Sequence, residues 1–473
     1  MVILFVSAGL AALAVLGGLH WYAYRRLVRD TTNGPGPVRR LGAAVFVAGP
    51  LLMVGAVASE RAGAPFWLQR TLSWPGFLWM PLGLYLVLAL LAGEFVRPVL
   101  RWALERRAAG RRETGGAGSP AVTGQAEPRE SVRPASGTAP AGTERPGPAE
   151  PAASPEPEGP AEPAGQAEPT GEAGPAEPAR SAEPGAGAEP AEPAGALRAP
   201  SRRLFVSRVV GGAAAAVAVG TVGHGTYGVL RGPGVKRVTV PLAKLPRSAH
   251  GFRIAVVSDI HLGPVLGRGF AQKVVDTINS TQPDLIAVVG DLVDGSVKNL
   301  GPAAAPLAGL RARHGSYFVT GNHEYFSGAE QWIREVRELG IHPLENARTE
   351  LAGFDLAGVN DLQGESEGQG PDFGKALGDR DRTRACVLLA HQPVQIHEAV
   401  RHGVDLQLSG HTHGGQLWPG NFVAAAANPT VAGLERYGDT QLYVSRGAGA
   451  WGPPTRVGAP SDITVVELAS REA

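Results

Sequence analysis

The stretch Val404–Gly415, VDLQLSGHTHGG, joins an alternating apolar run to a glycine-rich turn that carries two histidines one residue apart. The alternation over VDLQLS is typical of a β-strand. Two imidazoles at the end of a strand fit a metal-binding turn, but a polar loop would have the same local sequence. The role of His411 and His413 therefore depends on what the other strands carry at their ends.

Residues 235–473 repeat this strand-then-turn pattern and predict one α/β domain of ordinary size. The strand-like runs alternate with helical stretches such as FAQKVVDTINS and AEQWIREVREL. Several runs are continuously apolar, as in sheets that are buried on both faces. The strand-like runs are RIAVVSD, LIAVVGD, SYFVTGN, CVLLAHQ, DLQLSGH, QLYVSRG and DITVVEL.

Five of these strands end in a cluster rich in Asp, His or Asn. Each cluster alone would be an ordinary turn or cap, but ligands of α/β proteins gather beyond the carboxyl ends of strands, so the five are expected to converge. Carboxylate, imidazole and amide oxygen suit divalent Mn, Fe or Zn, and the lack of thiolates argues against a structural zinc site. So many ligands exceed what one ion needs, which predicts a two-metal site. The clusters are Asp259-Ile260-His261, Gly290-Asp291, Gly321-Asn322-His323-Glu324, His391-Gln392-Pro393 and Gly410-His411-Thr412-His413.

The order D-x-H, GDLVDG, GNHE, HQP and GHTHGGQ resembles the calcineurin-like metallophosphoesterase superfamily. The GHTHGG form and the apolar N-terminal region resemble its bacterial membrane-associated or exported branch. The resemblance covers residues 235–473, about half of the chain. It implies an α/β fold with a two-sheet sandwich flanked by helices, and a centre of two divalent metal ions.

The resemblance also implies a role for each motif residue. Asp291 would bridge both metals, Asp294 would orient His323, and His323 would protonate the leaving alkoxide or steady the transition state. Two ions about 3.5–4 Å apart can deprotonate a bridging water and clamp phosphoryl oxygens during in-line displacement. Asp294 has an alternative role as a turn residue in VDG. The ligands implied for the first metal are Asp259, His261 and His413, and those for the second are Asn322, His391 and His411.

The sequence does not identify the residues that would bind substrate. Protein phosphatases of the superfamily carry an arginine where this chain has Gly295, so a phosphoserine or phosphothreonine phosphatase is disfavoured. Arg446 and Arg456 either reach a substrate phosphate or lie on the surface as ordinary arginines. Glu324 either supports the site or acts as a helix N-terminal acid, and Asp361 is expected in a loop near the site.

The first hundred residues contain three apolar runs, at 2–19, 41–59 and 77–95. Each is close to the roughly 20 residues that cross a hydrocarbon core about 30 Å thick. Buried core helices are the alternative, but the aromatic and arginine flanks favour the membrane. A further Ala/Gly-rich segment at 201–230 opens with SRRLF and is either a fourth transmembrane helix or a twin-arginine-like signal anchor.

The organisation predicted from these segments has four parts. Residues 1–105 hold three transmembrane helices, and residues 106–200, rich in Ala, Glu, Pro and Gly with a recurring AEP triplet, form a disordered linker. Residues 201–230 anchor the chain again, and residues 235–473 form the metallophosphoesterase domain. Arginines cluster after the first run, after the third and before the fourth. The positive-inside rule then predicts a multi-pass protein of the cell membrane with its catalytic domain on the extracytoplasmic side.

These predictions converge on a membrane-anchored, metal-dependent phosphoesterase that hydrolyses a phosphomonoester or phosphodiester. The substrate is either lipid-linked or soluble. The alternative is a non-catalytic transport or sensing protein with a degenerate phosphoesterase domain, which the complete ligand set disfavours. A net charge of +1 without a basic stripe gives no case for nucleic acid as a partner, and the single cysteine, Cys386, excludes an internal disulfide.

Overall fold

The structure, a computed structural model, describes residues 2–115 and 201–471. Most of the predicted linker, residues 116–200, lies outside the described residues. By their contacts, Met1–Gly110 and Pro200–Ala473 form one compact unit. That unit contains both the N-terminal helices and an α/β domain.

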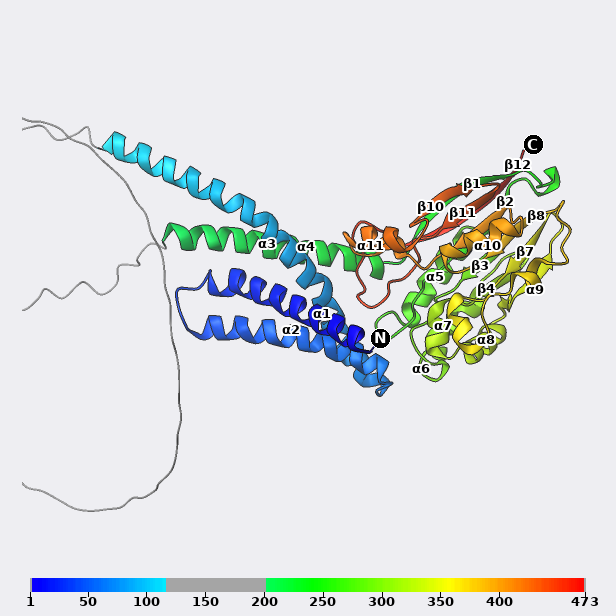
Figure 1. The fold of residues 1–473 in the computed structure, drawn as a ribbon, viewed down its shortest axis with the longest axis horizontal. Coiled ribbons are helices and arrows are strands. Elements are labelled where there is room, and N and C mark those ends of the chain that lie inside the picture. Colours follow the sequence, from blue (N-terminus) through cyan, green and yellow to red (C-terminus); the bar gives the residue numbers. More distant parts are fainter. Residues whose placement is uncertain (1, 116–200, 472–473) are drawn as a thin grey trace, which may run out of the picture. The chain divides into compact units, whose positions relative to one another are not determined.

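The α/β domain is built on two mixed sheets of six strands each (Figure 1). The first has the order β1 (Gly234–Leu242), β12 (Asp462–Ser470), β2 (Phe252–Val257), β3 (Leu285–Val289), β4 (Ser316–Val319) and β5 (His342–Pro343). The second has the order β10 (Gly433–Tyr437), β11 (Thr440–Val444), β9 (Leu406–Ser409), β8 (Ala385–Leu389), β7 (Phe354–Gly358) and β6 (Ala347–Glu350). Neighbouring strands are parallel except in the pairs β12–β2, β10–β11 and β6–β7.

Alternation along the strands explains why the two sheets stack and why both are covered by helices. On β2, Ile254 and Val256 belong to the core between the sheets, whereas Ala255 and Val257 belong to the core beneath the helices. On β8, Val387 faces the inter-sheet core in the same way. Since successive side chains of a strand point to opposite faces, a strand covered on both sides must be apolar throughout. This confirms the predicted two-sheet sandwich flanked by helices.

Helices cover the outer faces of both sheets. On the first sheet, α5 buries residues spaced three and four apart, including Phe270, Val274 and Ile278, and α8 contributes the fully buried Trp332. The helices of the domain are α5 (Arg268–Ser280), α6 (Val297–Ala304), α7 (Asn322–Ser327), α8 (Ala329–Glu338), α9 (Phe373–Leu377), α10 (Ile396–Arg401) and α11 (Gly420–Ala427). All seven strand-like runs of the sequence are strands, and both named helical stretches are helices.

Four helices carry the apolar N-terminal runs: α1 (Val2–Tyr24), α2 (Pro37–Arg61), α3 (Phe66–Gly115) and α4 (Arg202–Leu230). Within the described residues, α2, α3 and α4 are long and apolar enough to cross a membrane. Helix α3 continues past the boundary predicted at residue 105. Its prolines lie inside the helix, as membrane helices tolerate.

Candidate metal centre

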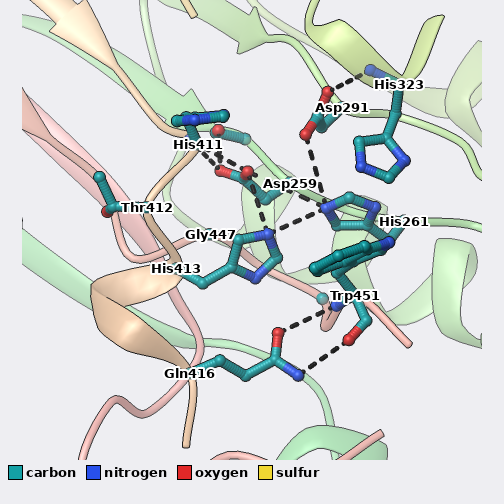
Figure 2. Close-up of polar contacts among 12 residues, drawn as sticks. Asp259, His261, Asp291, His323, His411, Thr412, His413, Gln416, Gly447 and Trp451 are labelled. Atoms are coloured by element: carbon teal, nitrogen blue, oxygen red, sulfur yellow. Dashed lines mark hydrogen bonds and ion pairs between the residues drawn. The ribbon is translucent and has the colours of Figure 1, made fainter. Parts of the chain in front are cut away.

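The polar clusters of the sequence meet at the carboxyl ends of neighbouring strands. Asp259 and Asp291 each lie two residues beyond the adjacent strands β2 and β3, and Asn322 opens α7 after β4. On the second sheet, His391 and His411 lie two residues beyond the adjacent strands β8 and β9. Figure 2 shows the side chains from both sheets pointing toward one another. The sandwich thus brings together residues up to 154 positions apart, from Asp259 to His413.

The backbone turns sharply at most of these positions. Five candidate ligands have a positive φ, a conformation that costs a non-glycine residue about 1–3 kcal/mol. Such strain persists where the surroundings over-determine it, and it gathers at functional sites. The φ angles are 53° at Asp259, 49° at His261, 54° at Asp291, 72° at His411 and 52° at His413.

One group of ligand atoms is formed by Asp259, His261 and His413, all buried. His413 Nε2 lies 3.3 Å from Asp259 Oδ1 and 3.0 Å from His261 Nε2. His261 Nδ1 lies 2.8 Å from the carboxylate of Asp294, which can only accept a hydrogen bond, so Nδ1 donates and Nε2 keeps its lone pair. Nitrogen and oxygen ligand atoms of these three residues thus lie within 4.8 Å of one another, as they do around a cation.

A second group is formed by Asp291, His391 and His411. His391 Nε2 lies 3.2 Å from Asp291 Oδ2, and His411 Nδ1 lies 3.0 Å from the side-chain oxygen of Asn322. The same Asp291 oxygen lies 3.7 Å from His261 Nε2 of the first group. Asp291 therefore adjoins both groups, and together with His261 and His323 it forms a third group of ligand atoms.

The second group fits a metal ion on a further observation. His391 Nδ1 donates to the carbonyl of Val289 at 2.9 Å, which turns Nε2 toward Asp291 as an acceptor. That Nε2 atom is fully buried and has no hydrogen-bond partner. Asp291 raises the pKa of the His391 imidazole well above its ordinary value despite the opposing effect of burial. The space between the two side chains favours a positive charge, and a divalent cation meets that need.

Protonation states in the centre suit metal binding. Burial disfavours charge on Asp259 and Asp291, but the surrounding histidines outweigh it and hold the pKa of both carboxyls well below their usual range. Burial lowers the pKa of His411 and of His413 to about 4. The carboxylates are thus anionic and these two imidazoles neutral near pH 7, the forms that coordinate metals.

Glycines leave room for this arrangement at two places. A Cβ on Gly321 would collide with the carboxylate of Asp291, and a Cβ on Gly410 would collide with Ser258 and Asp259. Both glycines occur in the motifs from which the site was predicted. The absence of a side chain lets neighbouring loops of the first sheet approach each other at Gly321, and loops of the two sheets at Gly410.

His323 and Asp294 lie beside the candidate ligands. Asp294 Oδ1 is 2.7 Å from His323 Nδ1 and 2.8 Å from His261 Nδ1, so one carboxylate contacts both rings. Burial lowers the pKa of His323, but Asp294, Asp291 and Glu324 together raise it to about 9. The link between Asp294 and His261 had no signal in the sequence beyond the aspartate of GDLVDG.

Glu324 supports the backbone of the centre. Its buried carboxylate accepts hydrogen bonds from the backbone N–H groups of Asp291, Leu292 and Gly321, at 2.9, 2.7 and 2.6 Å. Burial, followed by the charge of Asp291, raises its pKa to about 7. The sequence left two alternatives for Glu324, support of the site or a role as a helix N-terminal acid. Both apply, because Glu324 lies in the first turn of α7 and also binds the backbone of the loop that carries Asp291.

Arg456 and Asp361, two further polar residues singled out in the sequence, have structural partners. Arg456 is 5% exposed, so it is not the surface arginine that was one of its two alternatives. It donates to the carbonyls of Gly449, His413 and Ala459 and to His413 Nδ1 at 3.1 Å. Burial lowers its pKa to about 10. Asp361 caps a short 3-10 helix and accepts from Gln392 of the HQP motif at 2.9 Å. Arg446 is half-buried.

Known proteins share this region. Residues 252–415 match the calcineurin-like phosphoesterase family. The transmembrane protein with metallophosphoesterase domain of Danio rerio is 39% identical over 259 residues, which cover 52% of this chain and 59% of the relative, so the chain spans less than two thirds of that protein. A metallophosphoesterase of Helicobacter pylori is 37% identical over 248 residues, covering 52% of this chain and 66% of the relative. One from Aquifex aeolicus is 34% identical over 258 residues, covering 54% of this chain and 97% of the relative. The chain therefore belongs to the calcineurin-like phosphoesterase family.

Proposed function

We propose that this protein is a membrane-anchored phosphoesterase that depends on two divalent metal ions and hydrolyses a phosphomonoester or phosphodiester. The observation that carries the proposal is the position of Asp291, whose carboxylate belongs to the group with His391 and His411 and also lies 3.7 Å from His261 of the other group. A single ion would need only one of these groups. Family membership supports the same chemistry.

The residues that would hold the metals follow from the two groups. Asp291 would be shared, with Asp259, His261 and His413 on one side and Asn322, His391 and His411 on the other. When bound, Mn, Fe or Zn ions would neutralise charge on the phosphoryl oxygens and lower the pKa of water. The protein's own contribution is to hold these donors in place through Asp294, Val289 and Glu324.

His323 is the proposed proton donor to the leaving oxygen. Asp294 engages its Nδ1, which leaves donation to substrate to Nε2. A pKa raised to about 9 keeps the imidazole protonated at neutral pH. The rings of Phe326 and Trp451 pack edge-on against the His323 ring, with centroids 5.5 and 5.6 Å from its own.

The proposed location is the cell membrane, with several spans and the catalytic domain on the extracytoplasmic side. Contacts at one end of the helices support this orientation. Arg26 and Arg97 pair with Glu94 at 3.0 and 3.6 Å, and Arg208 donates to the carbonyl of Thr31 at 3.0 Å. The arginine-rich segments thus share one end, whereas α4 enters the domain from its other end. A periplasmic reporter fused after Ala473 is expected to be active, and a stable but inactive fusion would reverse the orientation.

The activity is tested on the full-length protein in nanodiscs with Mn and bis(p-nitrophenyl) phosphate. We expect hydrolysis that stops on chelation, and close to two metal ions per chain by elemental analysis. Asp291→Ala and His391→Ala are each expected to reduce both metal content and rate. Asp276→Ala on the surface of α5 serves as the matched control. Hydrolysis that survives either substitution in the centre contradicts the proposal.

A further inference from the structure

Helix α11 is an exposed apolar element that follows the histidine turn. It starts seven positions after His413, and none of its residues is buried. Phe422 is 67% exposed, Val423 74% and the preceding Trp418 49%. No Asp, Glu, Lys or Arg occurs between residues 414 and 434. Soluble surfaces intersperse charges, so an uncharged segment that exposes large apolar side chains indicates a surface meant to be covered.

The segment that leads into α11 contacts the helices expected to cross the membrane. The Tyr85 hydroxyl of α3 donates to the carbonyl of Trp418 at 2.8 Å. Leu417 and Val457 pack against a cluster formed by Tyr85 and Leu86 of α3 and by Ala218 and Val222 of α4. Nearby, Thr455 bonds Thr226 of α4 at 2.7 Å. The exposed apolar surface of α11 is therefore continuous with the apolar surface of the membrane helices.

These contacts are made well before the C-terminal end of α4, where the helix joins the domain. Val222 precedes the last residue of α4, Leu230, by eight positions, which is about 12 Å along a helix. That distance is a large part of one leaflet of a hydrocarbon core about 30 Å thick. A segment that packs at this level beside α3 and α4 meets lipid on its open side.

The same segment is joined to the candidate catalytic residues. The Gln416 side chain accepts from the backbone N–H of Trp451 at 3.0 Å and donates to its carbonyl at 3.0 Å. Figure 2 shows the Trp451 ring between Gln416 and the rings of His261 and His323. Glu60, near the end of α2, is close enough to Asp294 and His323 to interact electrostatically with both. The candidate metal centre therefore adjoins the side of the domain that faces the membrane.

We infer that the segment Leu417–Asn428, named here the α11 segment, inserts into the leaflet next to the phosphoesterase domain and presents the metal centre to phosphoesters carried by lipids. The inference deepens the proposed function and rests on it for the chemistry. Trp418, Phe422 and Val423 would contact acyl chains and the interface, as aromatic and aliphatic side chains of interfacial helices do. The phosphate of a lipid whose acyl chains pack against this segment would lie at the level of the headgroups, on the side of the metal centre.

Insertion is tested without any activity measurement. A fluorophore is attached to Phe422→Cys in the full chain in nanodiscs, since the native Cys386 is buried. The control is Asp439→Cys in the β10–β11 turn, at the end of β11 remote from the histidine turn. We expect lipids with a nitroxide on the acyl chain to quench the fluorophore at position 422 several times more than at position 439, and aqueous iodide to show the reverse order. Equal quenching at both positions overturns insertion, and so does protection from both quenchers together with a cross-linked dimer, which would assign the surface to a second copy of the chain.

Substrate class is tested with the double substitution Phe422→Asp and Val423→Asp. Misplacing a bound substrate by about 1 Å can cost on the order of 100-fold, so hydrolysis of phosphatidate or phosphatidylglycerol in vesicles is expected to fall about 10- to 100-fold. Hydrolysis of bis(p-nitrophenyl) phosphate is the reference and is expected to change far less. An equal loss on both substrates, or a wild-type protein that hydrolyses only the soluble ester, overturns the lipid assignment. If the metal-loaded wild type hydrolyses neither, the proposed function itself fails, while the quenching result still decides insertion.

Discussion

Replacing Asp294 by Asn tests a carboxylate that contacts two histidines at once. Its Oδ1 lies 2.8 Å from His261 Nδ1 and 2.7 Å from His323 Nδ1. An amide of the same shape carries no charge, so its oxygen can still accept from both rings but only through weaker, uncharged hydrogen bonds. A hydrogen bond to a charged group contributes about 1.5–3 kcal/mol, and about 1.4 kcal/mol equals a factor of ten. Asp294→Asn should therefore weaken metal binding through His261 about 10- to 100-fold, and slow proton donation by His323 by a similar factor.

The two effects separate in an assay that varies metal and leaving group. An alkyl phosphoester needs a proton on its leaving oxygen, whereas p-nitrophenolate leaves as a stable anion. At saturating Mn, Asp294→Asn and His323→Asn are both expected to slow the alkyl ester much more than the p-nitrophenyl ester. At limiting Mn, only Asp294→Asn should lose further activity. Equal losses on both leaving groups at saturating Mn would refute proton donation by His323, and an unchanged Mn affinity would refute the link through His261. Asp276→Asn, exposed on α5, is the control.

Three further substitutions or reactions test the surroundings of the centre. Gly321→Ala should lower metal content and melting temperature because its Cβ would collide with the Asp291 carboxylate, whereas calorimetry of Gly269→Ala, which has open space around it, should show no loss. Glu324→Gln should lower the free energy of unfolding by about 1–3 kcal/mol for each backbone N–H left unpaired, measured by urea denaturation against Glu330→Gln on the exposed face of α8; an equal effect of both would be contrary to the proposed support. Burial raises the pKa of the Cys386 thiol to about 12, so a disulfide reagent at pH 8 should label it only after unfolding, and rapid labelling of the native protein would contradict its place in the core.

Much of the fold could be predicted because the strands carry their own signals. The continuous apolar runs of β2, β3 and β8 are the direct result of burial on both faces. Polar residues that follow such runs can only lie at the strand ends, and parallel neighbours bring those ends together. The sequence missed weaker strands such as β6, with no fully buried residue, and the edge strand β1, which is half exposed. Their pairing depends on the neighbouring strand more than on their own composition.

Partners of the site residues were harder to predict, since they depend on packing between distant segments. Arg456 looks like any arginine in the sequence PPTRVG, yet the fold buries it against the carbonyl of His413 at 3.0 Å. The contact of Tyr85 with Trp418 joins residues 333 positions apart, and neither residue has a local pattern that signals it. Aromatic residues at such positions are equally typical of a membrane interface.

The turn at His411 and His413 shows why a two-metal arrangement needs both sheets. With φ of 72° and 52° at the two histidines, the chain turns at each of them, and their side chains point to different neighbours. His411 reaches Asn322 of the first sheet and lies edge-on to His391 of the second, with ring centroids 5.2 Å apart. His413 reaches Asp259 and His261, which follow β2. One three-residue turn thus contributes to both groups of ligands. Strain of about 1–3 kcal/mol at each histidine is offset by the contacts of the two imidazoles with Asn322, Asp259 and His261, and Gly410 lets the turn approach Ser258 and Asp259 closely.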